Sequence, residues 1–219
     1  MRMWRAFLML VLLAAAACSS ASAAPTTTIP APTVDDALAS AHDQKMAVFA
    51  GGCFWGIQAV FQHVNGVVMA TSGYAGGDEA SAHYEMVGTG NTGHAESVQV
   101  IYDPSKVTYG TLLRVFFSVA HDPTELNRQG PDSGTQYRSA VFTANPEQEK
   151  IVKAYIAQLD GASVFGSPIV TQVTPLMGFY PAEDYHQNYA TLHPYDAYIV
   201  INDAPKVRAL EKQFKDIYK

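Results

Sequence analysis

The stretch MAVFAGGCFWGIQAVF, residues 46–61, contains the signals that decide the local fold. Its first five residues form a short apolar run, which predicts a buried strand. Its last five residues have the spacing of the buried side of a helix. The glycines that separate the two runs permit a tight turn. The stretch therefore predicts a strand, a turn and a helix, with Cys53 where the strand ends and the helix begins.

Cys53 at this junction has the setting of a reactive cysteine. The unpaired N–H groups and positive end of a helix dipole favour a thiolate, and can lower a cysteine pKa to roughly 3.5–7.5. The neighbouring glycines would leave the sulfur uncovered, and Phe54 and Trp55 would form an apolar pocket beside it. A buried and inert cysteine is the alternative. The glycines on both sides of Cys53 favour a reactive cysteine over an inert one.

The composition indicates a soluble globular protein whose main partner is not nucleic acid. The chain has 219 residues, of which 48% are hydrophobic and 16% charged, which suits one compact domain with additional segments. The formal net charge is -6 and no block of Lys and Arg occurs, which argues against nucleic-acid binding. The two cysteines, Cys18 and Cys53, form neither a disulfide framework nor a CxxC pair.

Residues 1–24 have the features of a signal peptide. A positive start is followed by an apolar run at residues 6–17, which is too short to span a bilayer, and by a small-residue cleavage pattern at residues 21–23. Cys18 also resembles the lipid-modified cysteine of bacterial lipoproteins, although Ala15 stands where that signal prefers Leu. Both alternatives predict export to the periplasm or cell envelope, with membrane attachment only if Cys18 is lipidated.

The remaining chain predicts a tether followed by one α/β domain. Residues 25–44 are rich in Pro, Thr, Ala and Asp and predict a flexible tether, so the catalytic domain would cover residues 45–219. Strands and helices are interspersed, which predicts an α/β (α+β) two-layer sandwich. We expect a mixed sheet with flanking helices, a ferredoxin-like core and a monomer. The expected strands are residues 46–50, 66–74, 97–102, 139–143 and 169–173. The expected helices are residues 57–61, 108–117, 146–159 and 205–218, with a short helix or helical turn at residues 183–189.

Two polar loops, residues 81–93 and 121–138, precede or contain most of the other candidates for a functional site. The candidates from the first loop and the residues after it are Tyr84, His94 and Glu96. Those from the second loop include Asp132 and Tyr137. Spacing alone favours a solvated strand end for Glu96, whereas partial burial would raise its pKa and keep it protonated near neutrality.

Six sequence blocks resemble the peptide methionine sulfoxide reductase A family and occur in that family's order. They lie between about residue 45 and residue 200, which makes chance similarity a poor explanation. The blocks are residues 51–56 (GGCFWG), 73–77 (GYAGG), 92–96 (TGHAE), 102–104 (YDP), 134–139 (GTQYRS) and 182–187 (AEDYHQ).

The resemblance implies reduction of methionine-S-sulfoxide to methionine, which repairs oxidative damage to free methionine or to proteins. It makes Cys53 the nucleophile that ends as a sulfenic acid, and Glu96 the acid that protonates the sulfoxide oxygen. Tyr84 and Tyr137 would donate hydrogen bonds to that oxygen.

Three further roles follow from the same resemblance. Asp132 would hold water or the tyrosines in place, and Phe54 and Trp55 would contact the S-methyl group of the substrate. The family needs no bound cofactor and no metal ion, but it does need a thiol reductant. Many members carry further cysteines near the C-terminus, whereas none follows Cys53 here. We therefore expect an external thioredoxin-like or glutaredoxin-like reductant.

Three other functions remain open at the level of sequence. A thiol hydrolase would pair Cys53 with His94 or His186 as the base. A metal-binding protein would use Cys53 and the histidines, although the seven histidines show no HxxxH spacing. A structural protein would be indifferent to alkylation of Cys53.

Overall fold

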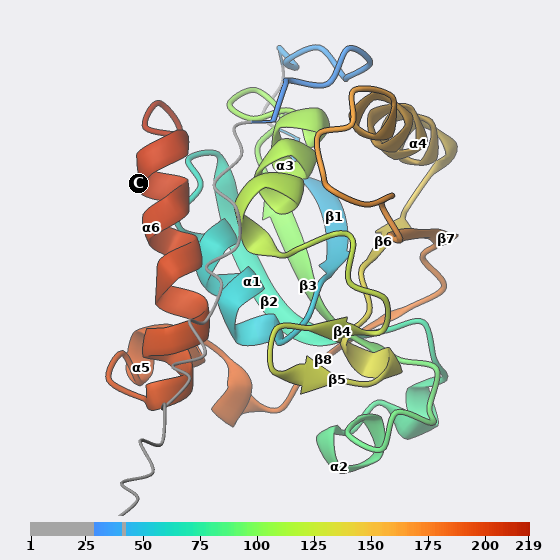
Figure 1. Cartoon of the computed structure of the whole chain (residues 1–219), viewed down its shortest axis with the longest axis vertical. Coiled ribbons are helices and arrows are strands. Elements are labelled where there is room, and N and C mark those ends of the chain that lie inside the picture. The colour runs from blue at the N-terminus through green and yellow to red at the C-terminus, as the bar shows by residue number, and fades with distance from the viewer. Residues whose placement is uncertain (1–28, 41–42) are drawn as a thin grey trace, which may run out of the picture.

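A mixed sheet positions the elements of the molecule, and the computed structural model describes residues 29–40 and 43–219 of the chain (Figure 1). Within these ranges six strands pair in the order β7-β6-β1-β3-β2-β8. All neighbours are antiparallel except β6 and β7. The strands are β1 (Lys45–Ala50), β2 (Val67–Ala75), β3 (Ala95–Tyr102), β6 (Ala140–Thr143), β7 (Gln172–Pro175) and β8 (Phe179–Pro181). The longer helices are α1 (Phe54–Gln62), α3 (Tyr109–Val115), α4 (Pro146–Gly161) and α6 (Ala204–Gln213).

The centre of the sheet has the predicted ferredoxin-like topology. In chain order β1, α1, β2, β3, α3 and β6 form a β-α-β-β-α-β unit, and its strands pair as β6-β1-β3-β2. This arrangement, with helices packed against a mixed sheet, confirms the predicted α/β fold class.

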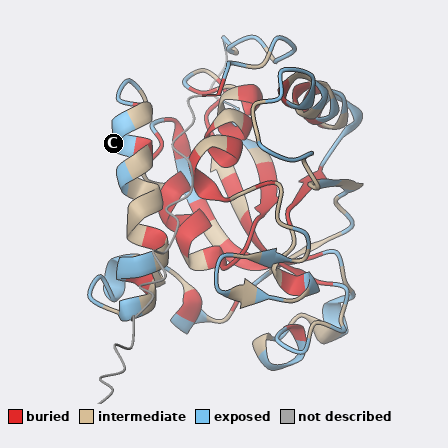
Figure 2. Ribbon diagram, viewed as in Figure 1, coloured by how far each residue is buried: buried red, intermediate tan, exposed pale blue. Residues whose placement is uncertain are grey.

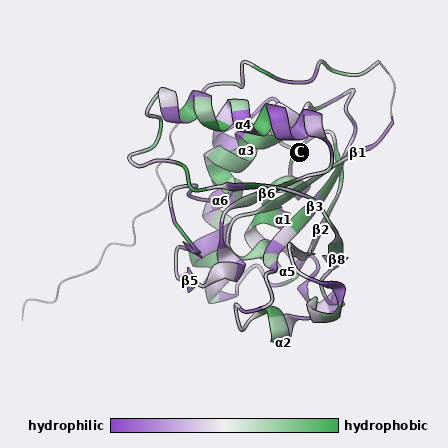
Figure 3. Cartoon of the chain, turned by 90° about the vertical axis from the view of Figure 1, so that its right-hand side faces the viewer, coloured by the Kyte–Doolittle hydropathy of each residue, from purple (hydrophilic) through white to green (hydrophobic). Residues whose placement is uncertain are grey.

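The main core lies between the sheet and the helices. Phe49 of β1 and Val98 of β3 face helix residues such as Ile57 and Leu112, and all four are at most 1% exposed. Figure 2 shows the buried residues along the sheet and the inner sides of the helices. In Figure 3, α4 lies next to α3 and alternates hydrophobic and hydrophilic residues, as expected of a helix with one buried side. Burying each large apolar side chain contributes about 1.5–3 kcal/mol.

Several elements differ from the sequence-based expectation in extent. β7 begins at Gln172 because Val170 is held by a backbone bond to Pro123 outside the sheet. The last helix, α6, ends at Gln213, after which the chain pairs Tyr218 with Val64. The two expected loops contain short elements, which are α2 (Tyr84–Val87), β4 (Arg128–Gln129), β5 (Asp132–Ser133) and a 3₁₀ turn (Thr135–Tyr137). Two further elements, β8 and α5 (Tyr189–Leu192), had no sequence signal.

Residues 29–40 contact the domain, in place of the free tether that their composition predicts. Ile29 is 1% exposed and its carbonyl accepts a hydrogen bond from Arg114. Asp35 accepts a hydrogen bond of 2.7 Å from the backbone N–H of Gly110, and the hydroxyl of Tyr155 donates to the carbonyl of Pro30. Composition predicts the absence of a helix or strand here, but extended chain can still pack through its backbone groups.

The predicted signal peptide and Cys18 lie outside the described residues. Among the helices that the structure does describe, none is both long and apolar enough to cross a bilayer.

Candidate active site

Cys53 is the N-cap residue of α1, directly after β1 and the two glycines. Gly52 has a φ of +93°, a conformation that L side chains rarely adopt. A Cβ at Gly52 would lie 2.6 Å from the side chain of Gln129, and one at Gly51 would lie 2.7 Å from the ring of His121. The glycines therefore permit both the turn and the close approach of the segment 121–138.

The Cys53 thiol is buried rather than uncovered, which corrects the expectation from the sequence. The residue is 8% exposed. Burial raises the pKa of Cys53 well above its ordinary value, and the carboxyl groups of Glu96 and Asp203 raise it further. The backbone N–H of Trp55 donates a hydrogen bond to the sulfur and lowers the pKa, as a helix N-terminus should. Desolvation outweighs this donor, so the thiol is the resting form.

Glu96 lies beside the first turn of α1. It belongs to β3, is 4% exposed, and its Oε2 accepts a hydrogen bond of 3.0 Å from the backbone N–H of Phe54. Burial raises the pKa of Glu96 to about 8, against the opposing effect of the Phe54 N–H. Glu96 is therefore protonated near neutral pH and has a proton to donate close to the sulfur of Cys53.

The two polar loops bring tyrosines to the same place. Tyr84 begins α2 and Tyr137 ends the 3₁₀ turn, and burial raises the pKa of each. The charges of Glu96 and Cys53 raise both values further, so both phenols lie near both groups. The phenols stay protonated at neutral pH and can donate hydrogen bonds.

Asp132 has a partner that the sequence did not indicate. Its Oδ2 accepts a hydrogen bond from the hydroxyl of Tyr198, not from Tyr84 or Tyr137. Burial raises the pKa of Tyr198, and the charge of Cys53 raises it further. Asp132 therefore holds a third phenol close to the sulfur.

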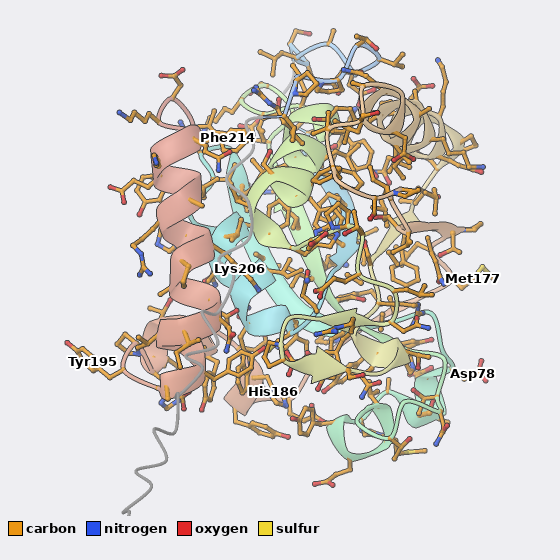
Figure 4. The ribbon with its side chains drawn as sticks, in the orientation of Figure 1. Asp78, Met177, His186, Tyr195, Lys206 and Phe214 are labelled. Carbon is orange, nitrogen blue, oxygen red and sulfur yellow. The ribbon has the colours of Figure 1, made fainter. Side chains whose placement is uncertain are left out.

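Trp55 is held in place by aromatic neighbours from the C-terminal part of the chain. Its ring stacks on Tyr189 with centroids 3.8 Å apart, and its indole N–H donates to Nδ1 of His186 at 3.2 Å. Figure 4 labels His186 near the lower end of α1. Phe54 is only 1% exposed and packs between Tyr74 and His186. Trp55 is thus the more accessible member of the predicted apolar pocket.

The histidines do not support a Cys-His catalytic pair. His94 Nδ1 accepts from the N–H of Gly77, and Nε2 lies 3.0 Å from the carbonyl oxygen of Asp78, so this ring stabilises a turn. His186 is engaged by Trp55. Within the described ranges, no group of three or more His, Cys, Asp or Glu residues has the arrangement of a metal site.

The structure places Cys53, Glu96, Tyr84, Tyr137 and Asp132 close together, while their chemical roles stay predictions. It adds residues that sequence reasoning missed, which are Tyr189, Tyr198, Asp203 and Lys206. For Tyr189 and Tyr198 the sequence signal was the density of tyrosines in residues 185–198, which does not indicate which ring faces Cys53, and no such signal marked Asp203 or Lys206.

Comparison with known proteins gives one consistent family. The family model described as peptide methionine sulfoxide reductase matches residues 45–218. Peptide methionine sulfoxide reductase MsrA 2 of Mesorhizobium japonicum is 59% identical to this chain over 82% of it and 92% of its own length. The MsrA 2 of Synechocystis sp. is 49% identical over 86% of this chain and 89% of its own length.

Two solved structures resemble the chain in three dimensions. Reduced Mxr1 from Saccharomyces cerevisiae has a TM-score of 0.64 at 35% identity, over 69% of this chain and 87% of that one. Methionine sulfoxide reductase A of Corynebacterium diphtheriae has a TM-score of 0.60 at 36% identity, over 78% of this chain and 86% of that one.

Proposed function

Because the chain belongs to the peptide methionine sulfoxide reductase family and is an oxidoreductase that reduces methionine sulfoxide, we propose that Cys53 is its nucleophile and Glu96 its acid. The observation that carries this assignment is the position of Glu96. It is a buried carboxyl group with a pKa of about 8, hydrogen-bonded to the residue that follows Cys53. An acid and a thiol at one helix N-terminus are what sulfoxide reduction needs.

The reaction follows from these two groups. The sulfur of Cys53 loses its proton and attacks the sulfoxide sulfur, while Glu96 protonates the sulfoxide oxygen. The protonated oxygen then passes from the substrate sulfur to the Cys53 sulfur as a hydroxyl group, and the bond between the two sulfurs breaks, which leaves methionine and a Cys53 sulfenic acid. The proton lost by Cys53 balances the one that Glu96 gives up. Methionine gains two electrons and Cys53 loses two. Two equivalents of an external thiol restore the Cys53 thiol and form one disulfide and one water.

The aromatic residues around Cys53 provide the seat for the substrate. The ring of Trp55, held by Tyr189 and His186, would contact the S-methyl group. Tyr84 and Tyr137 would donate hydrogen bonds to the oxygen, which fixes the face of the sulfoxide that meets the nucleophile. We assign the S epimer and either free methionine sulfoxide or oxidised proteins as substrates.

The physiological setting is part of the same proposal. No cysteine follows Cys53 in the sequence, so we assign the recycling step to a thioredoxin-like or glutaredoxin-like protein. Residues 1–24 support export to the periplasm or cell envelope, with a lipid anchor if Cys18 is modified. Proteolytic mapping and mass spectrometry of the mature N-terminus would distinguish the two exported forms.

An assay on the two separated epimers of methionine sulfoxide, with dithiothreitol as the donor, tests the assignment. The S epimer should be consumed and the R epimer should remain. Cys53→Ser should abolish turnover because the hydroxyl is a far weaker nucleophile, whereas the matched control Cys18→Ser should retain it. Substantial reduction of sulfoxide by Cys53→Ser would reject the nucleophile.

A further inference from the structure

An ion pair of a buried carboxylate and a partly buried ammonium group, from the C-terminal part of the chain, packs against the first turn of α1. Asp203 and Lys206 are joined by a contact of 3.1 Å between Oδ1 and Nζ. A Cβ at Gly56 would lie 2.7 Å from Cγ of Asp203 and 2.8 Å from Nζ of Lys206. Gly56 therefore permits the close approach of the pair, and Figure 4 shows Lys206 between α6 and α1.

A capping role in its own helix does not explain why the Asp203 carboxylate is buried. Asp203 is the N-cap residue of α6, where an Asp side chain ordinarily accepts a hydrogen bond from the helix, yet it makes no such bond. Its side chain is 0% exposed, and Oδ2 has no hydrogen-bond partner among the described residues. A buried ion pair of this kind is weak evidence for stability, because desolvation of the two charges opposes their attraction.

The pair lies close to the reactive sulfur. Gly56 is three residues after Cys53, so the two positions lie on the same face of α1. The negative charge of Asp203 raises the pKa of Cys53 and the positive charge of Lys206 lowers it. The other titratable groups whose charges interact with Cys53 or its neighbours here are Glu96, Tyr84, Tyr137, Tyr198 and Asp132.

We propose that Asp203 and Lys206 are positioning residues for the reaction, and that together they set how readily the Cys53 thiol ionises. The inference rests on the proposed role of Cys53 as the nucleophile. Lys206 is the cation among the groups whose charges act on Cys53, whereas the charges of Glu96 and Asp203 both disfavour the thiolate. The positive charge of Lys206 thus offsets the negative charge of Asp203, so the thiolate of Cys53 can still form.

The two residues should have opposite effects when each is changed alone. Lys206→Met leaves the negative charge of the buried Asp203 carboxylate uncompensated beside the sulfur, so the thiolate of Cys53 forms less readily. Asp203→Asn removes the negative charge while the side chain keeps nearly the same shape, so the thiolate of Cys53 forms more readily. A pair with only a structural role would not shift the ionisation of Cys53 in opposite directions.

The pH dependence of iodoacetamide alkylation of Cys53 measures this ionisation without any turnover. The midpoint should move up by about one pH unit in Lys206→Met and down by a similar amount in Asp203→Asn. At neutral pH the alkylation rate of Lys206→Met should then fall about tenfold. The double variant should have a midpoint between those of the single variants, and Lys206→Arg should restore the wild-type profile.

Lys212→Met is the matched control, since Lys212 lies on α6 but is exposed, and its profile should match the wild type. Circular dichroism of each variant checks that it folds, and Asp203→Asn alone suffices if Lys206→Met does not fold. An unchanged or raised midpoint in Asp203→Asn would overturn the inference. Sulfoxide reduction by the wild-type protein is assayed in parallel, so loss of the proposed function would be recognised separately.

Discussion

At the scale of single residues, the two reactive forms respond to pH in opposite ways: the protonated form of Glu96 decreases as the pH rises, and the thiolate form of Cys53 increases. Burial raises the pKa of Glu96 to about 8, so its protonated form predominates below that pH and is lost as the pH rises through it. Burial also raises the pKa of Cys53, so the thiolate increases with pH. The deprotonation of the acid Glu96 and the ionisation of the nucleophile Cys53 can therefore be measured separately.

Above about pH 8 the single-turnover rate of sulfoxide reduction should rise less steeply with pH than the alkylation rate of Cys53, because the neutral acid disappears while the thiolate forms. Alkylation of Cys53 should increase over the same range. Glu96→Gln should reduce the single-turnover rate by roughly 10²–10⁴-fold, since the amide cannot donate an acidic proton, and the remaining rate should rise with pH in parallel with the alkylation of Cys53. Glu85→Gln, an exposed change in α2, is the control. An unchanged rate in Glu96→Gln would reject the acid role.

The same two residues show what sequence could predict at this scale and what it could not. The position of Cys53 at a strand-to-helix turn follows from the glycines and the flanking apolar runs, which are all local. The ionisation of its sulfur does not, because it depends on Glu96 from β3 and Asp203 before α6. For Glu96, spacing alone favoured a solvated strand end, whereas packing against α1 leaves it 4% exposed. Burial is a property of the assembled fold.

At the scale of elements, the first turn of α1 packs closely against residues 203–206, which precede and begin α6. Gly56→Ala would raise the helix propensity of an isolated α1 by about 1 kcal/mol. In the folded protein the added methyl group would overlap Asp203 and Lys206. We therefore expect a net loss of about 1–3 kcal/mol in the free energy of unfolding, which is typical of overpacking.

Urea denaturation measures this loss, and Gly161→Ala supplies the matched control. Gly161 ends α4, and a Cβ there would meet no other atom within 4 Å. That change should be neutral or stabilising by up to about 1 kcal/mol. Equal effects of the two substitutions would show that α6 does not constrain α1.

Elements with a periodic apolar pattern were predictable, and the short ones that complete the site were not. β1 and α1 are apolar and buried along most of their length, β3 alternates buried and partly buried residues in its second half, and α4 has one buried side with helical spacing. The two site loops contain elements of only two to four residues, too short for such a pattern. They are tied together instead by long-range bonds, as when Arg138 donates to the carbonyls of Gly93 and His94. No property of Arg138 in the sequence identifies those carbonyls.

At the scale of the whole molecule, the predicted tether and the site belong to different parts of the fold. Residues 29–40 run across the region of α3 and α4 (Figure 1), whereas the site is built at the N-terminal end of α1. The N-terminal segment should therefore contribute to stability and leave the chemistry of Cys53 unchanged. Its composition could not indicate this, because Ile29, Val34 and Leu38 are scattered apolar residues in a stretch rich in Pro, Thr and Ala, and nothing in that stretch singles out Ile29.

Ile29→Ala tests this division between stability and chemistry. Ile29 is 1% exposed, so truncation of its side chain should lower the free energy of unfolding by about 2–5 kcal/mol, as for other large-to-small core substitutions. The single-turnover rate should remain at the wild-type value. Leu38→Ala is the matched control in the same segment, and because Leu38 is 57% exposed its effect should stay within about 0.5 kcal/mol. Equal stability of the two variants in urea would mean that residues 29–40 do not pack on the domain in solution, and the tether predicted from composition would be reinstated.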